Sequence, residues 1–264
     1  MEVVAHVINA FQSALREGRP KLLVGICGRA GSGKSTLART LAQDLRDRGI
    51  ESVCYAGDWR LSLDSANRKA WIGQSWEAGI SAYLSAINQF NWWDFAAIEG
   101  DLDRIMAGEP VMLRNAYDRA TGERNLLVEL PAFDRGVVIF ENAILGGVDS
   151  LIRLEKILLV NTPDRLCFER TLEKDADRRS IPEIAARYLM TTYSENFFLE
   201  SLHHFQEKII TCDSSGDLGT YPEVVPCAHI PFARKVLAGL LPAILREGVP
   251  KRDVPEVEPM PSQP

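Results

Sequence analysis

The sequence predicts an α/β fold built on a parallel sheet, and two observations carry this prediction. First, a short apolar run at residues 21–27 leads through a glycine-rich turn into a helical pattern at 34–48, and a second strand-like run follows at 51–56. This succession is a βαβ unit, whose strands pair in parallel. Second, three further short apolar runs predict the remaining strands, at 137–141, 156–161 and 208–212.

Composition limits the class of protein. The chain has 264 residues, of which 46% are apolar and 25% charged, so it can build a large core and is not generally disordered. Its net charge of −6 argues against a nucleic-acid partner, because such proteins usually carry a basic patch. No run approaches the ~20 apolar residues of a membrane span. Five cysteines without CxxC spacing predict free thiols and a cytoplasmic location. Homo-oligomerisation stays open.

The remaining elements divide the chain into three parts. An amphipathic helix is expected within residues 1–20, ended by Gly18 and Pro20. The main domain is expected over 21–248, with an insertion at about 59–135 and a lid at about 163–190. Residues 249–264 are rich in proline and predict a disordered tail. The expected helices of the insertion, the lid and the C-terminal part cover residues 66–72, 77–89, 94–107, 163–175, 182–204 and 232–247.

The turn after the first strand carries a phosphate-binding motif. Residues 28–35, GRAGSGKS, fit GxxxxGK[ST] between a strand and a helix, as in P-loop NTPases. Glycines let backbone N–H groups converge on phosphates, and the helix start adds a positive dipole end. Lys34 is expected to reach the β/γ-phosphates of ATP, and Ser35 to hold Mg²⁺. The predicted ATP-binding residues are Gly28, Ala30, Gly31, Ser32, Gly33, Lys34, Ser35 and Thr36. The alternative is a glycine turn without a ligand.

Two carboxylates follow predicted strands. Asp58 comes just after the run at 51–56, and Glu141 ends the run at 137–141. In an open parallel sheet, ligands bind outside the carboxyl ends of the strands, so both should face the phosphate loop. Glu141 is a candidate Mg²⁺ ligand. Asp58 is a candidate base for a substrate hydroxyl and a second metal ligand. Each carboxylate could instead cap a turn or a helix.

Five segments follow one another in a characteristic order: GICGRAGSGKSTLARTLAQDL, YAGDW, AGEPVMLRNAYDRATGER, VVIFENAIL and NTPDRLCFERTLEKDADRR. In this order they resemble the uridine kinase family, which belongs to a wider group with phosphoribulokinase and pantothenate kinase. The resemblance implies a nucleoside-kinase-like fold with a helical lid, ATP and Mg²⁺ as cofactors, and Asp58 as catalytic base. It also implies acceptor contacts by Tyr117 and Arg124. The lid arginines that it implies are Arg170, Arg178 and Arg179, although a mixed-charge helix can also be a solvated face.

The chain departs from that family on the acceptor side. The family's histidine after Tyr-Asp is replaced by Gly122 or its neighbour Thr121, and its Phe-Asp-His-Pro-x-Ala segment by residues 91–96, NWWDFA. A site that loses groups bonding one ring should accept a different substrate. Trp59 and Trp93 are candidate acceptor-pocket residues, although most tryptophans are core.

These observations predict a kinase that transfers the γ-phosphoryl group of ATP to a hydroxyl of a small molecule. Lys34, Asp58, Arg170 and Arg178 are the expected catalytic residues. Two alternatives stay open, namely a kinase for a sugar, a polyol or a pantothenate-like alcohol, and a non-catalytic nucleotide-binding regulator.

Overall fold

A computed structural model describes residues 1–177 and 179–219. The expected helix at 232–247, the expected tail at 249–264 and the candidate lid residue Arg178 lie outside these residues. None of the described helices has the length and apolarity that crossing a bilayer requires.

The centre of the fold is a five-stranded parallel sheet in the order β2-β5-β1-β6-β7. The three inner strands β5, β1 and β6 are buried almost throughout, as is typical of parallel sheets covered on both faces, whereas the edge strand β7 is partly exposed. The predicted fold class is confirmed, and each predicted strand end lies within one residue of the observed one. The strands are β1 (Lys21–Gly28), β2 (Ser52–Ala56), β5 (Gly136–Glu141), β6 (Lys156–Val160) and β7 (Ile209–Cys212).

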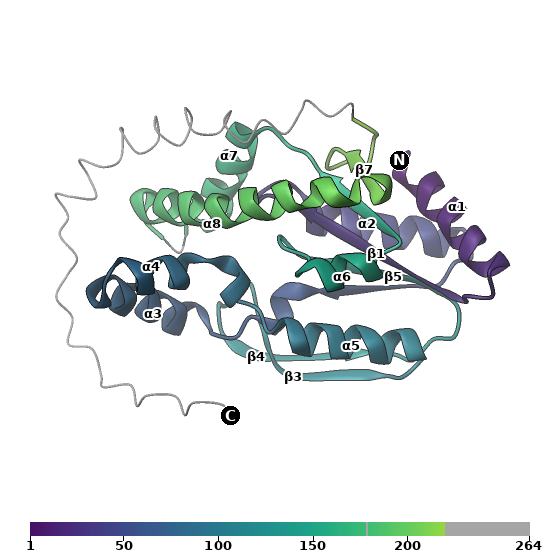
Figure 1. Cartoon of the computed structure of the whole chain (residues 1–264), viewed down its shortest axis with the longest axis horizontal. Helices are drawn as coiled ribbons and strands as arrows, with labels where there is room; N and C mark the ends of the chain where they lie inside the picture. The colour runs from purple at the N-terminus through teal and green to yellow at the C-terminus, as the bar shows by residue number, and fades with distance from the viewer. Residues whose placement is uncertain (178, 220–264) are drawn as a thin grey trace.

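Helices cover both faces of this sheet (Figure 1). On one face α1 (Val3–Arg16) and α2 (Lys34–Asp47) pack on alternate residues of β1, including Val24 and Ile26. On the other face, Leu23 and Cys27 of β1 join a second core cluster. That cluster is completed by α5 (Phe95–Ala107), α6 (Val148–Arg153) and the C-terminal part of α8 (Ile181–Ser201).

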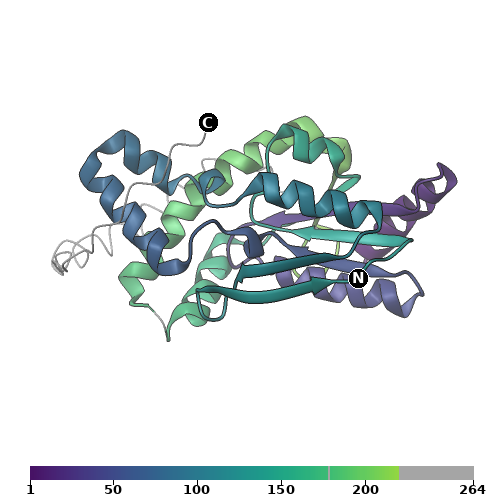
Figure 2. The same ribbon diagram turned by 90° about the horizontal axis from the view of Figure 1, so that it is seen from below.

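The insertion contains helices and a hairpin. Helices α3 (Ser65–Ala78) and α4 (Ile80–Ile87) follow the short 3-10 helix η1 (Gly57–Arg60) and lie at the end of the molecule away from α1 in both views (Figures 1 and 2). The antiparallel strands β3 (Val111–Tyr117) and β4 (Arg124–Leu130) were not predicted. The alternation of apolar and polar residues in these strands is short. In β3 it is interrupted by a register shift at Asn115, whose φ is 55°, so the sequence shows no clear two-residue periodicity there.

The region in which the lid is expected, about 163–190, holds α7 (Asp164–Asp175) and the first half of α8, and both helices lie close to the predicted 163–175 and 182–204. Helix α8 ends three residues earlier than predicted, because the chain tightens into the 3-10 segment η3 (Leu202–Lys208). Helix α3 extends well beyond the predicted 66–72 at its C-terminal end. Residues of α3, the β3–β4 turn, α7 and α8 meet in one cavity at the carboxyl ends of the strands.

Candidate functional site

The phosphate loop joins β1 to α2. Lys34 begins α2 and is only 8% exposed, and its Nζ donates a hydrogen bond to the Arg29 carbonyl oxygen at 2.8 Å. Gly31 and Gly33 adopt positive φ angles of 78° and 100°, and any residue with a side chain would be strained in this conformation. The loop residues that line the cavity are Ala30, Gly31, Gly33, Lys34, Ser35 and Thr36.

Two other predicted loop residues lie beneath the cavity. Ser32 is fully buried, and a Cβ on Gly28 would lie 2.6 Å from the carbonyl oxygen of Val160 in the neighbouring strand. Gly28 and Ser32 are therefore absent from the described lining. Gly28 allows β1 and β6 to approach each other closely.

The predicted carboxylates come together at the carboxyl ends of the neighbouring strands β2 and β5. Strands β2 and β5 are neighbours, and Ala56 pairs with Glu141, so Asp58 in η1 lies just beyond that pair. Glu141 Oε1 accepts a hydrogen bond from Ser35 Oγ at 3.1 Å. Burial raises the pKa of Glu141, Lys34 opposes this, and the Asp58 carboxylate adds to it. A buried carboxylate beside a hydroxyl and a second carboxylate is an oxygen donor set that fits Mg²⁺.

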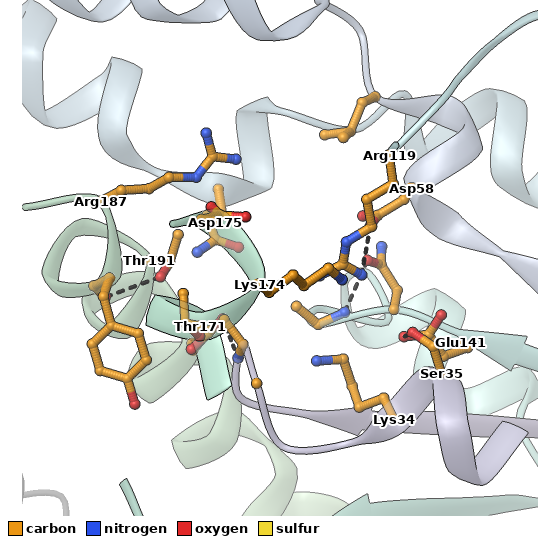
Figure 3. Close-up of a pocket in the computed structure, with 18 of the residues that line it drawn as sticks. Lys34, Ser35, Asp58, Arg119, Glu141, Thr171, Lys174, Asp175, Arg187 and Thr191 are labelled. Carbon is orange, nitrogen blue, oxygen red and sulfur yellow. Dashed lines mark hydrogen bonds and ion pairs between the residues drawn. The ribbon is translucent and has the colours of Figure 1, made fainter. Parts of the chain in front are cut away.

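These groups open into one cavity of about 350 Å³ (Figure 3). Lys34, Ser35 and Glu141 lie on one side of it, and Asp58 and Arg119 lie next to them. The cavity is large enough for a small ligand and continues toward the insertion and α8.

Helix α7 lies directly against the phosphate loop. A Cβ on Gly31 would lie 2.2 Å from the Cys167 carbonyl oxygen, so only glycine permits this approach. Arg170 of the same helix lines the cavity, with Nη1 3.5 Å from the carbonyl oxygens of Gly31 and Ser32. Of the other lid arginines, Arg179 also lines the cavity and pairs with Asp175.

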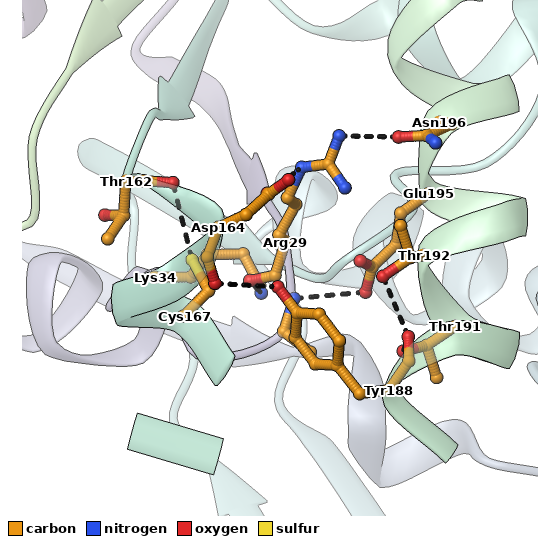
Figure 4. A network of polar contacts seen from close by, with 11 residues as sticks. Arg29, Lys34, Thr162, Asp164, Cys167, Tyr188, Thr191, Thr192, Glu195 and Asn196 are labelled. Atoms are coloured by element: carbon orange, nitrogen blue, oxygen red, sulfur yellow. Dashed lines mark hydrogen bonds and ion pairs between the residues drawn. The ribbon is translucent and has the colours of Figure 1, made fainter. Parts of the chain in front are cut away.

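A buried polar network attaches α8 to the same loop (Figure 4). Glu195 Oε1 accepts the Ala30 N–H at 3.1 Å, and burial raises the pKa of this carboxyl. Arg29 pairs with Asp164 at 3.2 Å and also donates to the Asn196 side chain. No local spacing pattern predicts this network, because Glu195 lies 165 residues from Ala30 in the chain.

The predicted acceptor residues are only partly brought together. Tyr117 and Trp93 line the cavity, whereas Trp59 and Arg124 are not among the described residues that do. The Trp59 ring instead packs edge-on against Tyr55, with centroids 5.5 Å apart. Arg124 donates to the carbonyl oxygens of Ser62 and Asn115, at 2.8 and 3.3 Å, and so braces the hairpin.

Four arginines that line the cavity are absent from the site residues predicted from the sequence, namely Arg39, Arg68, Arg119 and Arg187. Arg119 lies 3.3 Å from Asp58, and this carboxylate raises the pKa of Arg119. Arg68 of α3 and Arg187 of α8 also line the cavity. Arg119 follows the Tyr-Asp pair at 117–118, which is a local signal, but a single arginine within α3 or α8 carries none.

Comparison with known proteins finds a family match and a similar kinase sequence. Residues 23–197 match the model of the phosphoribulokinase / uridine kinase family. A uridine kinase from Leuconostoc citreum is 28% identical over 178 residues, which cover 66% of this chain and 79% of that protein.

Solved structures show the same fold. A phosphoribulokinase from Rhodobacter spheroides superposes with a TM-score of 0.55 at 14% identity, covering 87% of this chain and 99% of that one. D-glycerate 3-kinase from Cryptococcus neoformans gives 0.54 at 12% identity, with 83% and 98% covered. The family match spans most of the chain, and the chain therefore belongs to the phosphoribulokinase / uridine kinase family.

Proposed function

We propose that this protein is an ATP- and Mg²⁺-dependent kinase that transfers the γ-phosphoryl group to a hydroxyl of a small molecule. One observation carries the proposal. Asp58 and Glu141 stand at the ends of neighbouring strands, in the same cavity as Lys34 and Ser35. Nucleotide binding alone needs no second carboxylate at that position, and this favours a kinase over a non-catalytic regulator.

The residues divide the work as follows. The loop from Ala30 to Thr36 binds the phosphates of ATP, and Lys34 neutralises charge on the β- and γ-phosphates. Ser35, Glu141 and Asp58 would hold Mg²⁺, which when bound neutralises phosphate charge. Arg170 and Arg178 of the lid stabilise charge on the transferring group.

Asp58 has the freedom that a base needs, since 28% of its side chain is exposed in the cavity. It orients the acceptor hydroxyl and takes its proton. The acceptor oxygen forms a bond to the γ-phosphorus as the bridging bond to the β-phosphate breaks, and ADP leaves. Catalysis is then mainly alignment and charge stabilisation.

The acceptor is proposed to differ from uridine. Gly122 offers no side chain to a pyrimidine ring, and Trp92 and Trp93 line the cavity where the family has a polar segment. The names of the similar proteins cover uridine, D-glycerate and phosphoribulose kinases, which supports a small-molecule kinase in general.

The test is an ADP-release screen across nucleosides, sugars, polyols, hydroxy acids and pantothenate. Acceptor-dependent ADP release by the wild-type protein, lost in Lys34→Ala, is the expected result. If no acceptor stimulates ADP release while ATP binds normally, the non-catalytic alternative is favoured.

A further inference from the structure

The cavity is more cationic than a nucleotide site requires. Eight cationic side chains and four carboxylates line it, in a chain whose net charge is −6. The cationic residues are Lys34, Arg39, Arg68, Arg119, Arg170, Lys174, Arg179 and Arg187, and the carboxylates are Asp58, Glu141, Asp175 and Glu195. Positive charge beside the phosphate loop suits ATP, so the excess at the other end needs its own explanation.

Four of the cavity's arginines, Arg68, Arg119, Arg179 and Arg187, come from outside the phosphate loop and helices α2 and α7, and two of these four pair with a carboxylate within the cavity. Arg119 pairs with Asp58, and Arg179 pairs with Asp175. These two ion pairs leave Arg68 and Arg187 as the two of the four that have no carboxylate partner at ion-pair distance within residues 1–177 and 179–219.

Arg68 is anchored by neutral groups. It is 3% exposed, and its guanidinium lies 5.1 Å from the centre of the Trp92 ring and 5.4 Å from that of Tyr117. It donates to the Leu63 carbonyl oxygen at 3.1 Å. Aromatic stacking fixes this side chain and leaves its charge uncompensated.

Arg187 has neither stacking nor hydrogen bonds in the part of the chain that the structure describes. It extends from α8 into the pocket, on the opposite side from Asp58 and Arg119 (Figure 3). Burial, with the like charges of Arg68 and Arg179, lowers the pKa of Arg187 to about 10. The Asp175 carboxylate offsets part of this effect, but a partly buried charge near two like charges remains costly unless a ligand compensates it.

We propose that the acceptor carries an anionic group, a phosphate or a carboxylate, which Arg187 and Arg68 bind while its hydroxyl reaches Asp58. Guanidinium groups match both anions with paired N–H donors. The inference rests on the proposed kinase function and narrows its acceptor to an anionic alcohol, which a free nucleoside, sugar or polyol is not.

Activity with matched acceptors tests this directly. One series is glycerol, D-glycerate and glycerol 3-phosphate, and the other is ribitol, ribonate and ribitol 5-phosphate. Each series changes only the terminal group, so its members separate carboxylate from phosphate. ADP release is measured for the wild type, for Arg187→Gln and for Arg165→Gln. Arg165 is the control because its side chain is 83% exposed on α7, outside the described cavity lining.

We expect an anionic member to exceed its neutral counterpart, and Arg187→Gln to lower its kcat/KM about 10- to 100-fold, mainly through KM. Arg165→Gln should behave as wild type. Preference for the neutral member, or an equal loss in Arg187→Gln with all acceptors, overturns the inference. Thermal unfolding of each variant shows that it is folded.

A binding measurement decides the case in which no acceptor turns over. With the phosphate loop saturated by Mg²⁺ and a non-hydrolysable ATP analogue, inorganic phosphate or D-glycerate should raise the Tm of the wild type and of Arg165→Gln. Arg187→Gln should lose this effect. If the Tm of all three proteins responds equally to the anion, the inference is wrong. If the protein is not a kinase, ADP release is absent, but the anion still raises the Tm of the wild type.

Discussion

Arg119 lies 3.3 Å from Asp58, and this ion pair attaches the turn of the β3–β4 hairpin to the end of strand β2. Both side chains keep access to solvent, at 48% and 28% exposed. The proposed base and its counter-ion therefore come from different parts of the fold. An acceptor that reaches Asp58 must approach it beside Arg119.

This pair should act as a unit in catalysis. We expect Arg119→Gln to lower kcat about 10-fold, because contacting residues couple by roughly 0.5–3 kcal/mol. Since Arg119 positions Asp58, the double variant with Asp58→Asn should be no slower than Asp58→Asn alone. A double-mutant cycle on kcat measures this, and strictly additive losses would show that Arg119 acts independently of Asp58.

Asp58→Asn should lower kcat by ~10²-fold or more while ATP binding is largely kept. An amide cannot take the hydroxyl proton, and a positioned base contributes 10²–10⁴-fold. Turnover and ATP affinity are measured together. Asp103→Asn is the matched control, because the Asp103 side chain is 66% exposed and pairs with Arg153. An unchanged kcat would assign the base to another residue.

Lys34→Ala should abolish phosphoryl transfer in a protein that stays folded. Lys34 bonds to the Arg29 carbonyl oxygen and lines the cavity, so its charge serves the phosphates rather than the core. Steady-state turnover and circular dichroism check the two parts. Lys69→Ala, at an exposed lysine of α3, should keep wild-type activity. Near-normal turnover in folded Lys34→Ala would refute the assignment.

Uridine and cytidine should be poor acceptors. Gly122 has no side chain to form a hydrogen bond with a pyrimidine ring. The loss of such hydrogen bonds can remove several kcal/mol of the discrimination between acceptors, whereas an apolar mismatch changes it by only ~1–3 kcal/mol. The kcat/KM for uridine is compared with that of the best acceptor in the screen. A value near 10⁴ M⁻¹s⁻¹ or above, within the ordinary enzyme range, would make this a plain uridine kinase.

Glu195→Gln should stabilise the protein without ligand at neutral pH. Because burial raises the folded-state pKa of Glu195, its stabilising contribution is complete below the unfolded-state value and is lost as pH rises through the folded-state value. Glutamine keeps an oxygen for the Ala30 N–H and has no proton to lose.

Thermal unfolding at pH 4 and pH 7 measures this effect. The Tm of the variant should exceed that of the wild type only at the higher pH. Each unit by which the folded-state pKa of Glu195 is raised corresponds to about 1.4 kcal/mol in the free energy of unfolding, and each kcal/mol corresponds to about 2–4 °C in Tm. Glu200→Gln, on the exposed side of α8, should show no gain. A Tm gain of equal size at both pH values would contradict the titration.

The sheet and the phosphate loop could be predicted because their signals are local. Buried parallel strands are continuous apolar runs, and the loop is a contiguous motif. Asp58 and Glu141 could be located because strand ends share one edge of the sheet. The position of Trp59 directly after Asp58 predicts that both face the pocket, but successive residues of a 3-10 turn point about 120° apart, and Trp59 is not among the lining residues.

The residues on the acceptor side of the cavity could not be predicted from local sequence patterns. Arg68, Arg119 and Arg187 come from α3, the hairpin turn and α8, and only the fold brings them to one cavity. A single arginine within a helix has no pattern that distinguishes it from a solvated charge. The hairpin that carries Arg119 could not be predicted, because the register shift at Asn115 interrupts the alternation of apolar and polar residues in β3.

Helix α8 contacts both ends of the cavity. Arg187 faces the acceptor end, and Glu195 holds the Ala30 N–H of the phosphate loop. Eight residues of helix separate them by about 12 Å along one rigid axis. A tilt of this axis would displace both contacts at once. If ATP and the acceptor bind as proposed, the length of α8 between these two residues would set the spacing between them, and the surrounding loops would not.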